Sequence, residues 1–216
     1  MDRYERQLRF WTAISWLLPT AVALQGAWRG REASGLRVGR AFSDLPRWYL
    51  VAFLVPYVAL FVRLWRPLPV RLPPVAGLAS SATGAALSLI GMGLILWGRL
   101  ALGRMYNVSS AFGTRLYADQ ELVTSGPFAL VRHPMYVGAL IAGVGGVLLY
   151  RTWASVLILA QETVFWVRAG REDQALAAEF GEEWRKYARR VRAGVPVIGG
   201  PRVELATTNV AASKKS

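Results

Sequence analysis

Long apolar segments bounded by arginine residues are the feature of this sequence that most constrains its fold. A helix needs about 17 to 25 mostly apolar residues to cross a bilayer. Residues 10–28, 48–65 and 75–102 reach that length. Two shorter stretches, 135–150 and 153–167, are separated only by Arg151 and Thr152, which predicts a helical hairpin. The sequence therefore predicts an all-α polytopic membrane protein with about five transmembrane helices.

Composition supports this prediction and excludes several chemistries. The chain is 54% hydrophobic with a mean hydropathy of +0.30, which is more apolar than is usual for a soluble domain of 216 residues. Its net charge of +13 comes from basic residues that flank the apolar stretches, so we expect contact with anionic lipid head groups and no nucleic acid partner. The absence of cysteine excludes disulfides and thiolate nucleophiles. No metal-ligand spacing occurs, so no metal site is predicted.

The distribution of arginine indicates an orientation in the membrane. With five spans, loops 29–47 and 99–132 lie on the same side as the C-terminal segment, and together these regions carry most of the basic residues. The positive-inside rule then places the C-terminal region in the cytoplasm. Arg63, Arg66 and Arg71 fall on the opposite side. We also expect kinks at Pro19 and Pro56 within the first two spans.

Small residues recur at intervals of four in two of the predicted spans. Ser80, Gly84 and Ser88 form one such ridge, and the second lies along the fourth span at Gly138, Ala142 and Gly146. Small side chains let helix backbones approach closely. Both ridges therefore predict helix packing.

The segment after the hairpin has a different pattern. Residues 171–191 carry one apolar stripe at three- and four-residue spacing, formed by Leu176, Phe180, Trp184, Tyr187 and Val191. This pattern predicts a separate amphipathic helix lying in the membrane interface, with Trp184 and Tyr187 as lipid anchors. Glu182 and Lys186 are predicted to form an ion pair across one turn of that helix.

Two polar clusters stand at the ends of the predicted hairpin. His133, the only histidine, precedes Pro134 and has Tyr136 one turn ahead of it; alone, it could simply begin a helix. Arg168 and Glu172 lie one turn apart where the fifth span ends. Because a hairpin returns the chain to the membrane surface from which it started, we expect the two clusters to meet.

These residues carry a resemblance to a known family. The stretch "ELVTSGPFALVRHPMYVG", followed after the hairpin by "RAGREDQALAAEFGEEWRKYARRV", resembles the isoprenylcysteine carboxyl methyltransferases. These are integral membrane enzymes that use S-adenosylmethionine, and the related phospholipid N-methyltransferases share much of the pattern. The resemblance covers about residues 121–205. The first hundred residues match only in being membrane spans.

The resemblance implies a role for each matching position. The matches of Leu122, Val123 and Phe128 contribute to the cofactor pocket. The residues whose matches contact S-adenosylmethionine are His133, Pro134, Met135 and Tyr136. The match of Glu172 holds the polar end of the cofactor, and the match of Arg168 faces the substrate carboxylate.

This sequence departs from the family pattern at a few of these positions. Asp173 stands where a second glutamate is common, and Phe128 where tyrosine is frequent. Arg192 replaces a usual proline, so we expect the last turn to continue helically.

The resemblance implies carboxyl O-methylation of a lipid-like acceptor, either a small molecule of isoprenylcysteine type or a lipidated peptide. A carboxylate is already ionised near neutral pH and needs no general base, and Arg168 can align it through paired hydrogen bonds. An amine acceptor, as in phospholipid N-methylation, would have to lose a proton and would lie beside a guanidinium group. A sterol-reductase-like oxidoreductase and a non-catalytic membrane protein are further alternatives.

The organisation expected from the sequence has three parts. Residues 1–102 hold three transmembrane helices, residues 103–205 form the catalytic cofactor-binding region, and residues 206–216 form a disordered tail.

Overall fold

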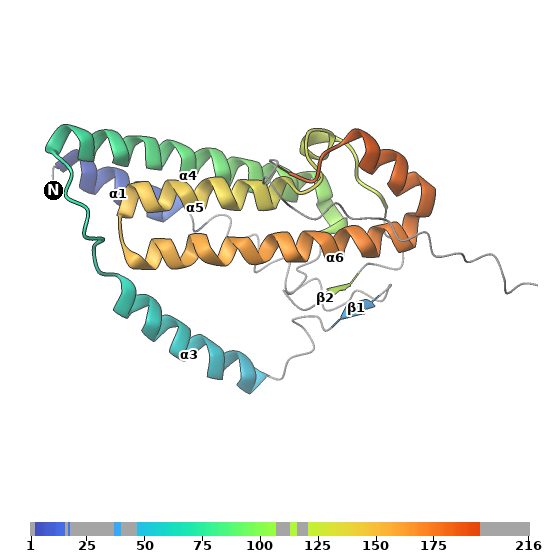
Figure 1. Cartoon of the computed structure of the whole chain (residues 1–216), viewed down its shortest axis with the longest axis horizontal. Helices are drawn as coiled ribbons and strands as arrows, with labels where there is room; N and C mark the ends of the chain where they lie inside the picture. The colour runs from blue at the N-terminus through green and yellow to red at the C-terminus, as the bar shows by residue number, and fades with distance from the viewer. Residues whose placement is uncertain are drawn as a thin grey trace, which may run out of the picture.

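The fold is built from long helices that run side by side. The computed structural model describes residues 3–15, 17, 37–39, 47–106, 113–115 and 121–194. The helices are α1 (Arg3–Ser15), α3 (Arg47–Leu64), α4 (Pro74–Leu102), α5 (Pro134–Tyr150) and α6 (Trp153–Arg190), with short 3-10 turns η3 (Gly103–Met105) and η4 (Gly126–Ala129). Helices α4, α5 and α6 lie along one another, α1 packs on α4, and α3 extends away from them (Figure 1).

Two short strands qualify the all-α prediction. β1 (Arg37–Gly39) pairs antiparallel with β2 (Gly113–Arg115), with Val38 opposite Thr114. This strand pair lies beside α6 in Figure 1 and joins the two predicted loops 29–47 and 99–132. The described part of the chain is therefore mostly helical with one small strand pair.

Membrane-spanning character is clearest in α4. Among the described residues, Pro74–Leu102 is the one helix both long and apolar enough to cross a bilayer, while the apolar helical segments Val55–Leu64 and Pro134–Tyr150 are shorter. Helix α3 runs through Pro56 without ending. Helix α1 begins at Arg3, seven residues before the predicted first span, and residues 18–28, with Pro19, lie outside the described residues.

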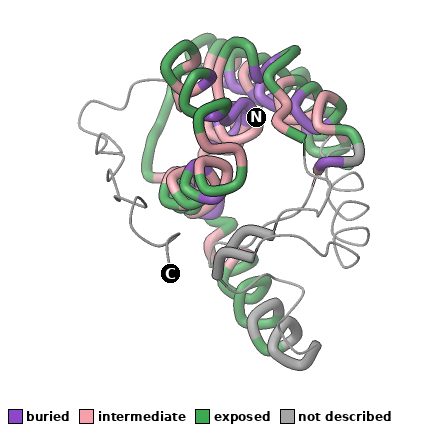
Figure 2. The backbone as a smooth tube through the Cα atoms, turned by 90° about the vertical axis from the view of Figure 1, so that its right-hand side faces the viewer, coloured by how far each residue is buried: buried purple, intermediate pink, exposed green. Residues whose placement is uncertain are grey.

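Apolar side chains are exposed on the outer faces of these helices. Buried residues are concentrated inside the helical bundle, and most of the α3 residues whose burial is described are exposed (Figure 2). Large apolar residues with exposed side chains include Val55 and Val62 on α3 and Ile90 and Leu100 on α4. An extended apolar surface of this kind suits contact with lipid rather than with water.

Small residues bring α4 and α5 into backbone contact, as their spacing predicts. A Cβ atom on Gly84 would lie 2.6 Å from the carbonyl oxygen of Gly145, and one on Gly91 would lie 2.4 Å from that of Gly138. The ridge on α5 differs from the prediction in one residue, because Gly146 meets no atom within 4 Å and Gly145 takes its place. Glycine is required at these contacts since no side chain fits between the two backbones.

The hairpin between α5 and α6 forms where the sequence predicts it. Arg151 adopts a left-handed conformation with φ 52°, and Thr152 caps α6 by accepting a hydrogen bond from the backbone N–H of Ser155 at 3.2 Å. Ser155 in turn accepts from the backbone N–H of Thr152, which completes a capping box. The turn thus reverses the chain within two residues.

The helix predicted over residues 171–191 forms, but it begins as a continuation of the fifth predicted span, and the prediction that Trp184 and Tyr187 anchor it in lipid is wrong. Helix α6 continues from the fifth predicted span to Arg190, with its only non-helical backbone at Gly181 (φ 52°, ψ −117°), where its direction changes (Figure 1). Glycine adopts this backbone conformation without strain. The bend turns Trp184 and Tyr187 inward, so that they are 2% and 4% exposed and pack within the protein instead of anchoring lipid.

Two smaller expectations about this segment are also wrong. Glu182 pairs with Arg189 at 2.7 Å and Arg185 at 3.5 Å, and not with Lys186. The helix ends before Arg192, because Val191 is extended with φ −114° and ψ 127°. The backbone carbonyl of Arg192 instead accepts a hydrogen bond from the N–H of Arg132, which holds this segment beside the start of α5.

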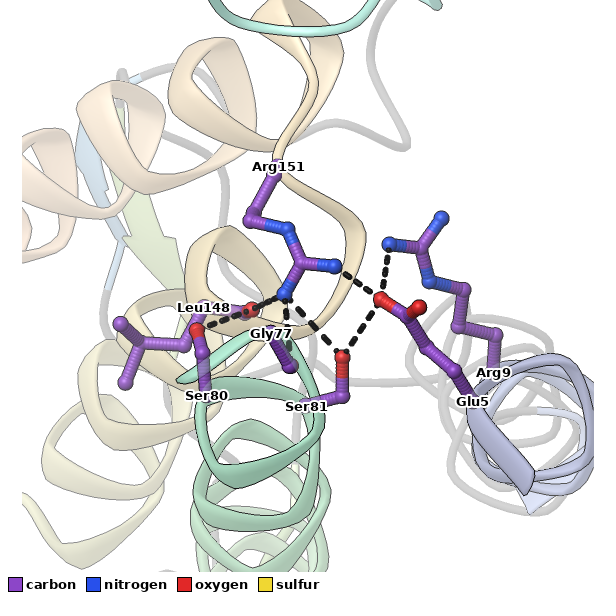
Figure 3. Close-up of polar contacts among 7 residues, drawn as sticks. All are labelled: Glu5, Arg9, Gly77, Ser80, Ser81, Leu148 and Arg151. Atoms are coloured by element: carbon purple, nitrogen blue, oxygen red, sulfur yellow. Dashed lines mark hydrogen bonds and ion pairs between the residues drawn. The ribbon is translucent and has the colours of Figure 1, made fainter. Parts of the chain in front are cut away.

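A buried charge cluster fastens α1 to the α5–α6 turn (Figure 3). The carboxylate of Glu5, which is 7% exposed, accepts hydrogen bonds from Ser81 at 3.0 Å, from Arg9 at 3.0 Å and from the guanidinium group of Arg151. Arg151 also donates to the carbonyl oxygen of Gly77 at 3.2 Å. The cluster closes the end of the bundle opposite His133.

Candidate functional site

The first turn of α5 presents two stacked rings. His133 occupies the N-cap position and Pro134 the first helical position, where proline needs no hydrogen-bond partner. The side chain of His133 makes no capping hydrogen bond, so its ring is available to other partners. It stacks on the ring of Tyr136, with centroids 5.5 Å apart and an angle of 12° between the planes.

Two consecutive acidic residues of α6 meet these rings. The phenol of Tyr136 donates a 2.6 Å hydrogen bond to Oε1 of Glu172, and Nε2 of His133 lies 3.0 Å from Oδ1 of Asp173. The other ring nitrogen of His133 is 3.8 Å from Oε2 of Glu172. His133 and Asp173 are buried, whereas the side chain of Glu172 keeps 21% of its surface exposed.

Two guanidinium groups complete this polar cluster. Nε of Arg168 lies 3.6 Å from Glu172, and its guanidinium carbon is 5.7 Å from the centre of the Tyr136 ring. Arg132 lies 3.4 Å from Oδ2 of Asp173. The two polar clusters predicted at the ends of the hairpin therefore meet, as expected from its topology.

Asp173 is the residue of this cluster that sequence reasoning did not select. Its side chain is among the most buried carboxyl groups described and contacts both His133 and Arg132. The sequence signal that could have identified Asp173 is its position next to Glu172. Consecutive residues lie about 100° apart around a helix, so Asp173 can face α5 at a different angle from Glu172. An acidic residue at that position can hold the imidazole ring in place.

The apolar residues named from the resemblance differ in their surroundings. Phe128 is buried in η4, and its carbonyl oxygen accepts a 2.7 Å hydrogen bond from Tyr187. Burial raises the pKa of Tyr187 to about 12, so its phenol remains a donor. Met135 packs on Gly98 of α4, and Leu122 and Val123 are half-buried in the segment before η4.

Tyr106, which the sequence analysis did not single out, lies within electrostatic reach of the cluster. Burial raises the pKa of its phenol, the positive charges of Arg99 and Arg168 lower it, and the charge of Glu172 raises it. In the described part of the chain, no group of three or more His, Asp or Glu side chains could hold a metal ion. The cluster offers acidic, imidazole, phenol and guanidinium groups around one point.

Comparison with known proteins gives this arrangement a class. Residues 79–183 match the model of the phospholipid methyltransferase family. The matched region contains most of α4, all of α5, the hairpin turn, and α6 from its start to residue 183. It therefore includes every residue of the polar cluster. Over about half of its length, the chain is therefore similar to this methyltransferase family.

Individual relatives are similar over the same part of the chain. The protein-S-isoprenylcysteine O-methyltransferase of Schizosaccharomyces pombe is 30% identical over 118 residues, which are 53% of this chain and 49% of the relative. The enzyme of the same name from Mus musculus is 34% identical over 126 residues, 55% of this chain and 44% of the relative. A methanethiol S-methyltransferase from Pseudomonas deceptionensis is 29% identical over 163 residues, 69% of this chain and 58% of the relative. The chain spans about half the length of the isoprenylcysteine methyltransferases it matches.

Proposed function

We propose that this protein is an integral membrane methyltransferase that uses S-adenosylmethionine to methylate the carboxylate of a lipid-like acceptor of isoprenylcysteine type. The observation that carries the proposal is the hydrogen bond between Tyr136 and Glu172, with Arg168 beside both. It joins the two motifs on which the resemblance rests, although they are far apart in the sequence. The acceptor would be a small lipid-like molecule or a lipidated peptide embedded among membrane lipids.

The polar cluster has the chemistry that S-adenosylmethionine requires. When bound, the cofactor supplies an electrophilic methyl group on a sulfonium sulfur. Its ammonium group suits the partly exposed carboxylate of Glu172, and its hydroxyl groups suit the imidazole and phenol of His133 and Tyr136. Pro134 and Met135 would complete this wall, and Leu122, Val123 and Phe128 would contribute its apolar side.

Arg168 is the residue that favours a carboxylate acceptor. Its guanidinium group contacts Glu172 and Tyr136 and is only 15% exposed, so it is held in a fixed position beside the proposed cofactor site. A guanidinium fork pairs with a carboxylate through two parallel hydrogen bonds. A carboxylate needs no general base, so placement and the exclusion of water are the main tasks of the protein.

The membrane arrangement forms part of the proposal. We assign spans to residues 10–28, 48–65, 75–102, 135–150 and 153–167, with the polar cluster at the cytoplasmic surface. The length of α4 and the exposed apolar side chains support this arrangement. Residues 1–102 would then serve mainly as membrane helices and 103–205 as the catalytic region, while the tail at 206–216 lies outside the described residues.

Phospholipid N-methylation is the second candidate, because the matched family is that of the phospholipid methyltransferases. The position of Arg168 weighs against it, since a guanidinium group beside an amine disfavours the approach of that amine in its protonated form. The name of the bacterial relative adds S-methylation as a third chemistry to be tested.

A methyl-transfer assay with base treatment separates these acceptors. Purified protein in lipid nanodiscs would receive S-adenosylmethionine labelled in its methyl group together with a farnesylated cysteine analogue, phosphatidylethanolamine or a small thiol. A methyl ester releases labelled methanol in alkali, whereas methylated amines and thioethers do not. We expect base-labile label on the prenylated acceptor. Base-stable label on the amine or the thiol alone would contradict the carboxyl assignment.

A further inference from the structure

Arg99, in the last turn of α4, is a buried cation that forms no ion pair with any of the described acidic residues. Its side chain is 9% exposed, and one terminal nitrogen donates a 2.8 Å hydrogen bond to the carbonyl oxygen of Gly103. Its Nε atom is buried and has no hydrogen-bond partner among the described residues. No carboxylate oxygen of the described chain forms an ion pair with it. A buried guanidinium group in this state is costly unless a ligand supplies the missing anion.

The position of Arg99 places it near the polar cluster. A Cβ atom on the preceding residue, Gly98, would lie 2.7 Å from Met135 and 3.5 Å from Pro134, so the end of α4 packs against the first turn of α5. The guanidinium carbon of Arg99 lies 4.3 Å from the centre of the Tyr106 ring. The last turn of α4, which carries Arg99, therefore lies beside the turn that begins with His133.

Tyr106 connects Arg99 with the other side of the proposed site. The phenol of Tyr106 responds to the charges of both Arg168 and Glu172 as well as to that of Arg99. Stacking on an aromatic ring holds a guanidinium plane in one orientation and leaves its edge free to bind a planar anion.

The charge balance of the cluster points to an anionic ligand. Arg168 is paired with Glu172 and Arg132 with Asp173, whereas Arg99 has no such partner in the described part of the chain. The two carboxylates of the cluster, Glu172 and Asp173, thus each have a guanidinium partner other than Arg99. The bond to Gly103 uses one of five donors of Arg99 and so accounts for little of its binding capacity.

We propose that Arg99, oriented by Tyr106, binds a carboxylate of a ligand in this site. The inference rests on the proposed function, because the two ligands of that reaction both contain a carboxylate. One source is the amino-acid end of the methyl donor, and the other is the acceptor group that is to be methylated. Arg99 is a binding residue in either case, and the two sources make different predictions for donor and acceptor affinity.

Isothermal titration of S-adenosylhomocysteine and acceptor kinetics test this proposal. The variants are Arg99→Met, which removes the charge with little change in length, and Arg99→Lys, which keeps the charge without the fork. Arg63→Met is the control, because Arg63 is an exposed arginine in the last turn of α3. Losing a hydrogen-bonded ion pair at a buried site lowers affinity by about tenfold or more.

Each outcome of the titration has a defined meaning. If Arg99 binds the donor, Arg99→Met weakens S-adenosylhomocysteine binding about tenfold or more, and the preference for this ligand over its decarboxylated analogue shrinks. If it binds the acceptor, the KM for the acceptor rises by a similar factor while S-adenosylhomocysteine binds as before. Unchanged donor affinity and unchanged acceptor KM in a folded Arg99→Met protein would overturn the proposal.

Two further comparisons keep the test interpretable. If Arg99→Met does not fold, Arg99→Lys is expected to show the same loss to a smaller degree, and wild-type affinities in Arg99→Lys would then overturn the proposal. If wild-type protein neither binds S-adenosylhomocysteine nor transfers methyl groups, the proposed function itself fails. By contrast, normal binding by the wild-type protein that the Arg99 substitutions leave unchanged would overturn only the proposed role of Arg99.

Discussion

The phenol of Tyr136 donates a 2.6 Å hydrogen bond to Glu172, a residue 36 positions further along the chain. This bond joins the first turn of α5 to the part of α6 just beyond the proposed membrane span. The same phenol ring is stacked on His133 and lies beside Arg168. Tyr136 therefore links the two halves of the polar cluster, as the contact between His133 and Asp173 also does.

Replacing Tyr136 by phenylalanine tests the value of this bond. The ring would keep its stacking on His133, but the carboxylate of Glu172 would lose the hydrogen bond from this phenol. A hydrogen bond to a charged group contributes about 1.5–3 kcal/mol. We expect kcat/KM for methyl transfer to fall by at least about tenfold, with a small change in thermal midpoint. Unchanged kcat/KM in the Tyr136→Phe protein would show that the bond does not position Glu172.

Asp173 is expected to matter for stability because it satisfies two partners at once. Asp173→Asn would leave Arg132 without its ion pair and replace the charged partner of His133 by an amide. Breaking a buried ion pair by removing one member costs about 3–5 kcal/mol. Thermal unfolding of the detergent-solubilised protein should show a lowered midpoint, with partial recovery in Asp173→Glu. Equal midpoints for wild type and Asp173→Asn would argue against this role.

The contact between α4 and α5 provides a matched pair of glycine substitutions. Gly91→Ala would place a Cβ atom 2.4 Å from the backbone oxygen of Gly138, whereas Gly93→Ala, half a turn away, meets no atom within 4 Å. Overpacking costs about 1–3 kcal/mol, so Gly91→Ala should lower the thermal midpoint. Gly93→Ala should leave it unchanged or raise it slightly, because alanine favours helix more than glycine does. Equal effects of the two substitutions would contradict the observed packing.

The Glu5 cluster predicts a pH-dependent contribution to stability. Burial alone raises the pKa of Glu5, but hydrogen bonds from Ser81 and Arg151 and the charges of Arg9 and Arg151 outweigh burial and lower the pKa below its ordinary value of 4.5. A lowered pKa in the folded state means that the ionised carboxylate stabilises the fold above pH 4.5. This contribution is lost as the pH falls through the folded-state pKa.

Comparison of wild type with Glu5→Gln isolates this contribution from those of other carboxylates. The difference between their thermal midpoints should be constant from pH 7 to about pH 5 and should shrink as the pH falls further. A difference that stays constant or grows below pH 4.5 would show that Glu5 does not stabilise the fold as a carboxylate.

Much of the helical layout could be predicted from local sequence. The hairpin at Arg151 and Thr152 and the start of α5 at Pro134 follow from apolar length and from the preference of proline for the first helical turn. The continuation of α6 could not be predicted, because its apolar stripe after Gly181 has the same spacing whether it faces lipid or protein. Burial of Trp184 and Tyr187 depends on the bend at Gly181, which brings them against η4 and Arg132.

The candidate site could be predicted in part for a similar reason. The meeting of Tyr136 with Glu172 follows from hairpin topology together with one-turn spacing. The positions of Asp173 and Arg99 depend on how α4, α5 and α6 are rotated about their axes, and the sequence pattern does not fix that rotation. The roles of the site residues stay predictions until ligand binding is measured.

Equilibrium binding of labelled S-adenosylmethionine to purified protein tests the central claim most directly. Wild type should bind the cofactor saturably, and Glu172→Ala should bind it at least about tenfold more weakly because the carboxylate proposed to hold the ammonium group is gone. Glu179→Ala, which removes an exposed carboxylate from the same helix, should bind like wild type. Wild-type affinity in Glu172→Ala, or no saturable binding by the wild-type protein, would contradict the account.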